Sequence, residues 1–125
     1  MQITTITDLF HQEFGSIANK FQVTDVALSE AKQSAEPYIS NPGVYVFWRP
    51  GAAIKVGRHL TNARKRALEH IRDNTAGLMA ALVHDESARL MLFSVKDRED
   101  VHWVAALEIF FERRLGCQIR AARLG

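Results

Sequence analysis

The chain has 125 residues, a formal net charge of +2 and one cysteine. This length suits one compact domain with its own core, and a single cysteine excludes an internal disulfide and fits a reducing compartment. The sequence has neither an apolar run of membrane-spanning length nor a signal peptide after Met1, so we expect a soluble cytoplasmic protein without a membrane partner.

Residues 1–40 are predicted to form a helical extension. Apolar residues recur at helical spacing over 7–21, and a shorter apolar stripe between Asp25 and Ser34 indicates a second helix that ends before Pro37. The segment carries no catalytic signature. We expect it to pack on the main domain, or to offer a surface for a protein partner or a second copy of the chain.

Residues 41–125 are predicted to form the main domain, which begins with a β-hairpin. Asn41-Pro42-Gly43 is a turn signal, and the two runs 43–48 and 53–57 favour short strands joined by a Pro-Gly turn. Because side chains alternate along a strand, Tyr45 and Phe47 are expected to share one face of the first strand.

The rest of the main domain alternates helices with one more strand. The predicted elements are a helix over 61–73, a short helix over 76–83, a strand over 89–95 and a long helix over 98–115. Thr61 or Asn62 can cap the first of these helices, and Gly116 stands where a glycine ends the last one. We therefore predict a small α+β domain, with a central three-stranded antiparallel sheet flanked by helices.

Basic side chains cluster in two parts of the chain, although the net charge is close to zero. The clustered residues are Arg58, Arg64, Lys65, Arg66 and Arg72 in or near one helix, and Arg113, Arg114, Arg120 and Arg123 towards the C-terminus. Such patches can attract a phosphate backbone, or they can form the solvated face of a helix. Charge by itself favours the solvated face.

Glu108 lies in a run from Val101 to Phe111 whose other side chains, apart from His102, are apolar or aromatic. A carboxylate on a stripe that faces the core is costly unless it is paired or bound to a metal. Two explanations stay open, which are an ion pair with a buried arginine such as Arg66, and a ligand for a divalent metal. A single carboxylate suits Mg²⁺ better than zinc, because Mg²⁺ keeps several waters and takes phosphate oxygens.

Four short motifs follow one another along the main domain. They are Gly43-Val44-Tyr45, Lys55-Val56-Gly57, Arg66 in the basic helix and Glu108 in the last helix. In order and spacing they resemble the motifs of the GIY-YIG nuclease superfamily, over roughly residues 42–115. The resemblance implies a metal-dependent endonuclease that hydrolyses DNA phosphodiester bonds, with Mg²⁺ or Mn²⁺ as its cofactor.

The resemblance also implies roles for the matching residues. Arg66 would hold the phosphate, Glu108 would hold the metal, and Tyr45 with Lys55 would activate the attacking water. A phenol has a reference pKa near 10. Lys55 on the neighbouring strand is the cation that we expect to favour the ionised form of Tyr45.

Further residues near these motifs are candidates for the same site. His59 and His70 could orient water or contact phosphate, or they could be packed polar residues. Gly57, a candidate for binding the substrate, is expected to allow a close backbone approach where its strand ends. Arg58, Arg64 and Lys65 are candidates for binding the substrate, and Arg64 is the alternative to Arg66 if the helix register differs.

The sequence also departs from the family pattern. Lys55 stands where most of the family has a second tyrosine, although some restriction-enzyme branches resemble this chain in carrying lysine there. Leu115-Gly116-Cys117-Gln118 stands where much of the family has a Pro and Asn stretch, and the Arg66 match assumes an insertion around 59–61. The alternative function is therefore a catalytically inactive module that keeps the fold and binds nucleic acid or a protein.

Overall fold

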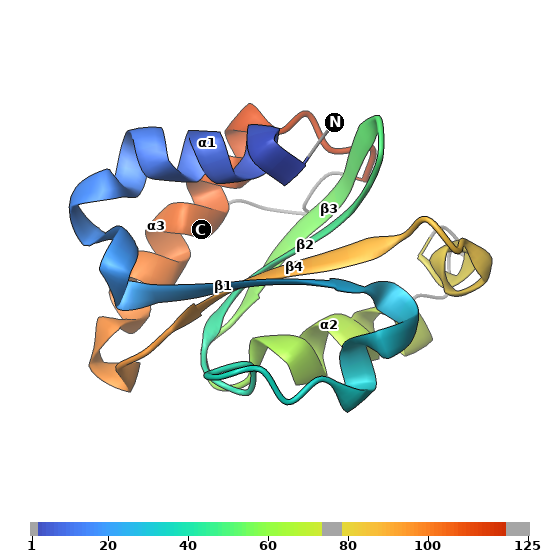
Figure 1. Ribbon diagram of the computed structural model, residues 1–125, viewed down its shortest axis with the longest axis horizontal. Coiled ribbons are helices and arrows are strands. Elements are labelled where there is room, and N and C mark those ends of the chain that lie inside the picture. The colour runs from blue at the N-terminus through green and yellow to red at the C-terminus, as the bar shows by residue number, and fades with distance from the viewer. Residues whose placement is uncertain (1–2, 74–78, 120–125) are drawn as a thin grey trace.

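A computed structural model describes residues 3–73 and 79–119, and its centre is an antiparallel sheet of four strands (Figure 1). The strands are β1 (Phe21–Ala27), β2 (Gly43–Arg49), β3 (Ala52–His59) and β4 (Arg89–Val95). Their order across the sheet is β1-β4-β2-β3, which makes β3 one of the two outer strands. The α+β class is confirmed, whereas the prediction of three strands is wrong by one.

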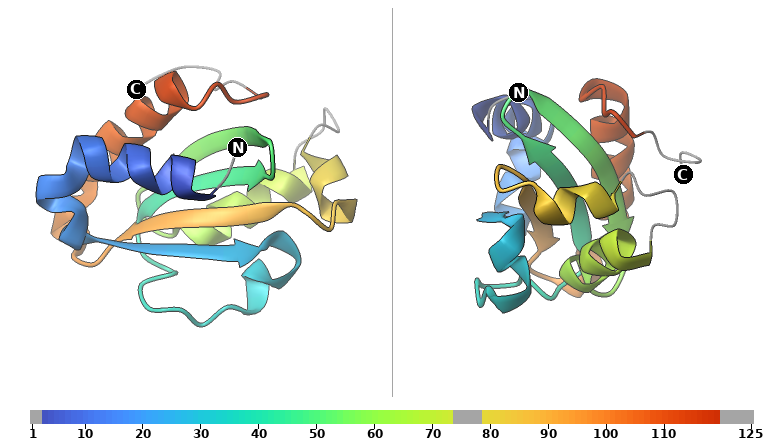
Figure 2. Two further views of the ribbon diagram at one scale, coloured as in Figure 1. Left: turned by 45° about the horizontal axis from the view of Figure 1, so that its top comes forward. Right: turned by 90° about the vertical axis from the view of Figure 1, so that its right-hand side faces the viewer.

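Helices cover both faces of this sheet. Helices α1 (Ile3–Phe14) and α3 (Val101–Arg114) lie together over one face, and α2 (Ala63–Asp73) covers the other (Figures 1 and 2). Short 3₁₀ helices span Gly15–Lys20, Leu28–Gln33, Ala80–His84 and Arg98–Asp100. Within the described residues, no helix combines the length and the apolar content that a membrane span requires.

The additional strand lies in the segment that was predicted to be entirely helical. The expected helix over 7–21 ends at Phe14, and β1 occupies the beginning of the second expected helix. A short apolar stripe does not distinguish a helix from a strand, and Val23, Thr24 and Val26 are β-branched residues that fit a pleated surface. Pairing with β4 along the whole of β1, from Phe21 opposite Val95 to Ala27 opposite Arg89, decides the conformation.

The apolar face of α1 is buried against the sheet of its own chain. Phe10 packs on Phe93 of β4 with ring centroids 5.0 Å apart, and Phe93 packs on Phe111 of α3 at the same distance. Ile6 and Phe14 belong to the same core. This face of α1 is therefore buried inside the molecule. Packing on the main domain was one of the two expectations for the N-terminal segment.

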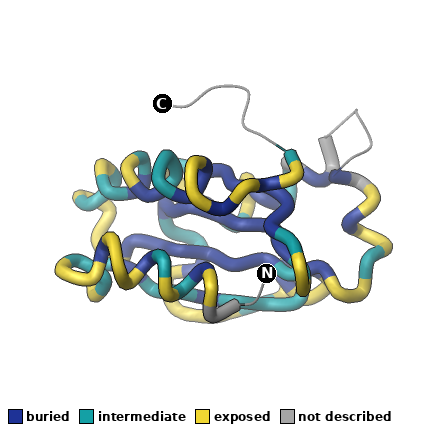
Figure 3. Tube along the Cα trace, turned by 90° about the horizontal axis from the view of Figure 1, so that it is seen from above, coloured by how far each residue is buried: buried dark blue, intermediate teal, exposed yellow. Residues whose placement is uncertain are grey.

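A second core lies between the sheet and α2. Tyr45 and Phe47 share one face of β2, as their alternation predicted, and this is the face that α2 covers with Ala63, Ala67 and Ile71. Leu60 precedes the helix and is 51% exposed. Strands β2, β3 and β4 are buried along most of their length and β1 is mostly half-buried, whereas exposed residues lie on the outer sides of the helices (Figure 3).

The turn before β2 fixes the position of the strand that carries Tyr45. The side-chain amide of Asn41 donates to the carbonyl of Val95 at 2.9 Å, and the Val95 N–H donates to the carbonyl of Pro42 at 3.0 Å. A Cβ atom on Gly43 would collide with the carbonyl oxygen of Phe93, so only glycine allows the two backbones to approach this closely.

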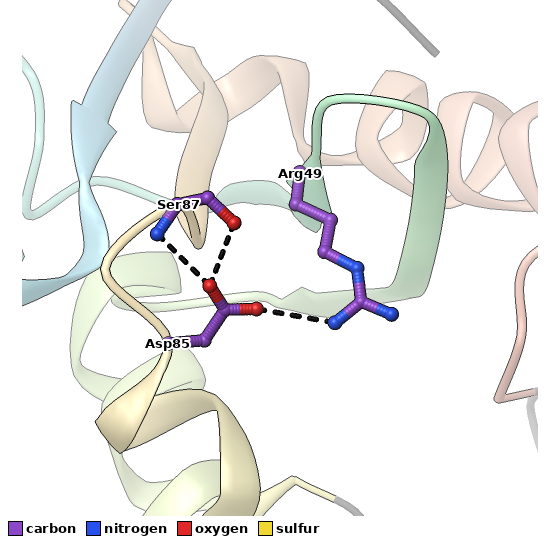
Figure 4. Close-up of polar contacts among 3 residues, drawn as sticks. All are labelled: Arg49, Asp85 and Ser87. Carbon is purple, nitrogen blue, oxygen red and sulfur yellow. Dashed lines mark hydrogen bonds and ion pairs between the residues drawn. The ribbon is translucent and has the colours of Figure 1, made fainter.

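The other end of the β2–β3 hairpin is attached to the loop before β4 (Figure 4). Asp85 accepts from Arg49 at 3.1 Å, and from the hydroxyl and the backbone N–H of Ser87 at 2.6 and 2.9 Å. These bonds, with the Ser87 hydroxyl first, lower the pKa of Asp85. A cavity of about 250 Å³ lies beside this ion pair. It is at the turn end of the hairpin, whereas Tyr45 lies towards the opposite end.

Candidate functional site

Tyr45 lies across Gly57, its direct partner on β3. A Cβ atom on Gly57 would stand 2.6 Å from Cε2 of the tyrosine, and still nearer to Cζ and the hydroxyl oxygen. Gly57 was expected to allow a close backbone approach to substrate, whereas the group packed against it is the phenol ring of its own chain. Because β3 is an outer strand, the ring extends from the inside of the sheet towards its edge.

Arg66 reaches the same phenol from α2. Its guanidinium donates a hydrogen bond to the Tyr45 side chain, while much of the arginine remains exposed to solvent. Asn62 sets the beginning of this helix, because its side-chain oxygen accepts from the backbone N–H of Lys65 at 3.0 Å. The predicted N-cap is therefore confirmed, and it fixes the turn of helix that presents Arg66.

Glu108 approaches from α3, which covers the other face of the sheet. Its side chain is 14% exposed, and its charge acts on the Tyr45 phenol together with that of Arg66. Arg66 thus reaches the phenol from α2 through a hydrogen bond, whereas Glu108 acts on it through its charge from the α3 side of the sheet.

The environment of Tyr45 favours its protonated form. The pKa of Tyr45 is raised to about 12: burial raises it most, the charge and hydrogen bond of Arg66 lower it, and the charge of Glu108 adds to the rise. At pH 7 roughly one Tyr45 side chain in a hundred thousand is therefore ionised. We expected Lys55 to be the cation beside the phenol, whereas the cation that lowers its pKa is Arg66.

Lys55 lies near this group without being opposite Tyr45. It pairs with Phe47, two positions before Gly57 on the same face of β3, and it is 8% exposed. The register of the hairpin shifts between Phe47 and Trp48, immediately beside it. Such bulges re-aim the side chains next to them. Lys55 therefore borders the site on the side of the hairpin turn.

Arg58 is the arginine that pairs with Glu108. Its Nη1 atom lies 2.5 Å from Oε1 of the carboxylate, and the two side chains are 28% and 14% exposed. Of the two explanations open for Glu108, the ion pair is thus present, with Arg58 in place of Arg66. The sequence did not suggest this pair, because alternation turns Arg58 away from the face of Tyr45 and towards the face that α3 covers.

His59 organises the chain before α2. Its Nδ1 atom accepts from the backbone N–H of Asn62 at 2.9 Å and from that of Thr61 at 3.3 Å. A backbone N–H can only donate, so this ring nitrogen carries no proton. His59 therefore acts on the site through the position of α2. The side chain of His70, the second candidate histidine, lies outside the described part of the structure.

The remaining basic candidates are not gathered at Tyr45. The guanidinium of Arg64 donates to the backbone carbonyl of Ser34 and to the hydroxyl of Ser40, which ties α2 to the N-terminal segment. The expectation that Arg64 binds substrate, or replaces Arg66, stays a prediction. Lys65 is exposed on α2, and the predicted cluster members Arg120 and Arg123 lie outside the described residues.

Sequence reasoning did not identify the most deeply buried carboxylate. Glu112, one turn after Glu108 on α3, is 2% exposed. The stripe of α3 that faces the core consists of Val104, Leu107, Phe111 and Glu112. Glu108 lies at the border of this stripe rather than at its centre, where its carboxylate can reach the edge of β3.

The donor atoms around Glu108 limit which metal could bind. Within residues 3–73 and 79–119, no group of three or more His, Cys, Asp or Glu side chains could hold a metal ion. A single carboxylate such as Glu108 would suit Mg²⁺ or Mn²⁺ held largely by water and by substrate phosphate.

Comparison with protein-family models, with curated proteins and with solved structures finds no match for this chain.

Proposed function

We propose that this protein is a metal-dependent endonuclease that hydrolyses DNA phosphodiester bonds. The proposal is supported by two observations: Arg66 and Glu108 both act on the Tyr45 phenol, Arg66 through a hydrogen bond and its charge and Glu108 through its charge, and Glu108 is paired with Arg58 of β3. Hydrolysis of a phosphodiester needs a group that orients water, a cation for the phosphate and a ligand for a metal. Tyr45, Arg66 and Glu108 have the corresponding chemistry, and their motifs resemble those of the GIY-YIG nucleases.

Arg66 is the proposed phosphate ligand. Its planar guanidinium can donate two parallel hydrogen bonds to phosphate oxygens, and it keeps its charge at any pH that the fold tolerates. During the reaction the water oxygen bonds to phosphorus and the ester P–O bond breaks, so negative charge increases on the phosphate oxygens. A fixed cation beside those oxygens stabilises this charge more than it stabilises the bound substrate.

Tyr45 is the proposed group that receives the attacking water. With a pKa of about 12 the neutral phenol holds the water by hydrogen bonding, and it can accept the water proton only after its own proton has passed to solvent. We propose that Lys55 assists from the same face of β3. A divalent ion held by Glu108 would polarise the phosphate and stabilise the leaving oxygen. The leaving oxygen then takes a proton from solvent.

A nucleic-acid-binding module without cleavage is the second candidate function. One observation favours it, namely the ion pair between Arg58 and Glu108 at 2.5 Å. A carboxylate that already has a cationic partner does not need a metal to compensate its burial. In this case Arg66 would still bind phosphate, and the protein would recognise DNA without cutting it.

Incubation of a labelled duplex and a supercoiled plasmid with Mg²⁺, with Mn²⁺ or with EDTA tests the proposal. We expect cleavage only with metal, and a loss of about 100-fold or more in Tyr45→Phe, Arg66→Ala and Glu108→Gln. Arg113→Ala removes an exposed arginine of α3 and serves as the control that keeps activity. Salt-dependent binding without cleavage would favour the second candidate, and absence of binding would refute both.

A further inference from the structure

Arg58 and Gly57 are consecutive residues that serve opposite faces of β3. Gly57 lies beneath the ring of Tyr45, on the face that α2 covers. Arg58 is opposite Val44, whose side chain belongs to the core beneath α3, and from there it reaches Glu108. Two adjacent positions of an outer strand therefore connect the phenol on one side of the sheet with the carboxylate on the other.

The two arginines of the site differ in what they contact. Arg66 is exposed and donates to Tyr45. Arg58 is only 28% exposed, and its guanidinium nitrogen lies 2.5 Å from Oε1 of Glu108, the proposed metal ligand. A cation thus already occupies a carboxylate oxygen that a metal ion would use, and the two cations must compete for it.

We propose that Arg58 guards Glu108. In the metal-free protein the guanidinium occupies the carboxylate, and when a divalent ion takes the carboxylate, the freed guanidinium moves to a phosphate of the bound DNA. This inference rests on the proposed function, which supplies both the metal and the DNA.

Both the release of Arg58 from Glu108 and its transfer to a DNA phosphate have a physical reason. A partly buried guanidinium that loses its carboxylate is left with an uncompensated charge, which is costly unless another anion replaces the carboxylate. A DNA phosphate is such an anion, and it suits the planar fork of an arginine. Each ligand then removes an obstacle to the other, so metal and DNA should increase each other's affinity by the same factor.

Metal binding without DNA tests the guard directly. Titration with Mn²⁺, followed by the electron paramagnetic resonance signal of the free ion, gives the affinity of each variant. Arg58→Gln should bind Mn²⁺ about tenfold more tightly than the wild type, if the pair is closed roughly nine-tenths of the time. Glu108→Gln should lose this binding, and the control Arg113→Gln should keep the wild-type affinity.

These titrations separate the two proposals. Equal affinity in the wild type and Arg58→Gln, with loss in Glu108→Gln, would overturn the guard and retain Glu108 as the metal ligand. Equal affinity in all four proteins would overturn the metal site itself, and the guard with it. Circular dichroism of each variant confirms that it is folded before the titration is interpreted.

A second measurement keeps Arg58 in place and needs no metal. In EDTA, Glu108→Gln frees the guanidinium, so a fluorescent duplex should bind more tightly than to the wild type. The slope of log affinity against log salt should be steeper by about one phosphate contact. Both gains should disappear in the double variant Arg58→Gln/Glu108→Gln.

The double variant distinguishes release of Arg58 from the loss of a negative charge. If the tighter binding persists without Arg58, a general change in charge explains it and the guard is overturned. If no variant binds DNA at any salt concentration, the proposed function fails, and so does the transfer of Arg58 to phosphate. The Mn²⁺ titrations would then still decide whether Arg58 competes for Glu108.

Discussion

At the scale of single residues, the site depends on a missing side chain. Gly57 has no Cβ, and the ring of Tyr45 occupies the space that a Cβ would need. This allows a buried phenol to lie over an outer strand, where Arg66 donates a hydrogen bond to it and the charge of Glu108 acts on it. The glycine was identifiable from the sequence, whereas its contact was not, because the contact depends on the register in which Tyr45 is opposite Gly57.

Replacement of Gly57 by Ala should destabilise the fold. The new methyl group collides with the tyrosine ring, and overpacking of this kind costs about 1–3 kcal/mol. Urea unfolding measures the free energy of unfolding. In a Tyr45→Leu background the ring is absent, so the same Gly57→Ala change should cost less. Equal costs in both backgrounds would show that the tyrosine ring is not the obstacle.

The pKa of Tyr45 should respond to its two charged neighbours in opposite directions. Glu108→Gln removes a charge that raises the pKa of Tyr45, so this variant should have a lower pKa. Arg66→Ala removes a charge that lowers the pKa, so this variant should have a higher pKa than the wild type, whose value is about 12. Ultraviolet absorbance titration measures each value after subtraction of the same protein carrying Tyr45→Phe. A pKa that neither variant changes would mean that neither charge acts on the phenol.

The raised pKa of Tyr45 also predicts how the free energy of unfolding changes at alkaline pH. The folded pKa of Tyr45 is raised above the ordinary value of 10.0, so the neutral phenol stabilises the folded protein. This contribution is complete below the unfolded pKa, and it is lost as the pH rises through the folded one. Over the window from about 10 to 12, the wild type should therefore lose more stability than Tyr45→Phe.

At the scale of elements, local sequence signals predicted the elements that depend on neighbouring residues alone. The Pro-Gly turn and the alternation gave the hairpin, and the glycine after α3 does adopt a positive φ of 60° at Gly116. β1 was not predicted, because its conformation depends on pairing with β4, whose residues are far away in the sequence. The Arg58–Glu108 pair was not predicted for a similar reason, since it requires α3 to cover β3.

The beginning of α2 should be sensitive to its cap. Asn62 accepts from the backbone N–H of Lys65 at 3.0 Å, so Asn62→Ala should lower the free energy of unfolding by about 1 kcal/mol. Asn62→Asp keeps an acceptor and should retain most of the stability. Thermal unfolding of the three proteins compares them. If alanine and aspartate behave alike, the hydrogen bond does not stabilise the helix.

At the scale of the whole molecule, the N-terminal segment is part of the sheet rather than an addition to it. β4 lies between β1 and β2, so the N-terminal segment supplies β1 as one of the two strands that pair with β4. Ile6, Phe10 and Phe14 of α1 belong to the core that also contains Val104 and Phe111 of α3. The helix that carries Glu108 thus packs in a core that residues 1–40 help to build.

A chain that begins at residue 41 should therefore fail to fold. It loses Ile6, Phe10, Phe14 and Phe21 from the core, and burial of each such side chain contributes about 1.5–3 kcal/mol. Together they are worth roughly 6–12 kcal/mol, comparable to the 5–15 kcal/mol by which whole domains are stable. The truncated chain also exposes the edge of β4 that β1 covers, which favours aggregation.

Size-exclusion chromatography and denaturant unfolding test this expectation. Phe10→Ala in the full chain is the graded comparison, since it should remain folded and lose about 3–5 kcal/mol. A truncated chain that stays monomeric and unfolds cooperatively would show that residues 41–125 are an independent domain with a dispensable extension. Aggregation or non-cooperative unfolding, beside a folded Phe10→Ala, would show that the sheet needs β1 and α1 to present Tyr45, Arg66 and Glu108 together.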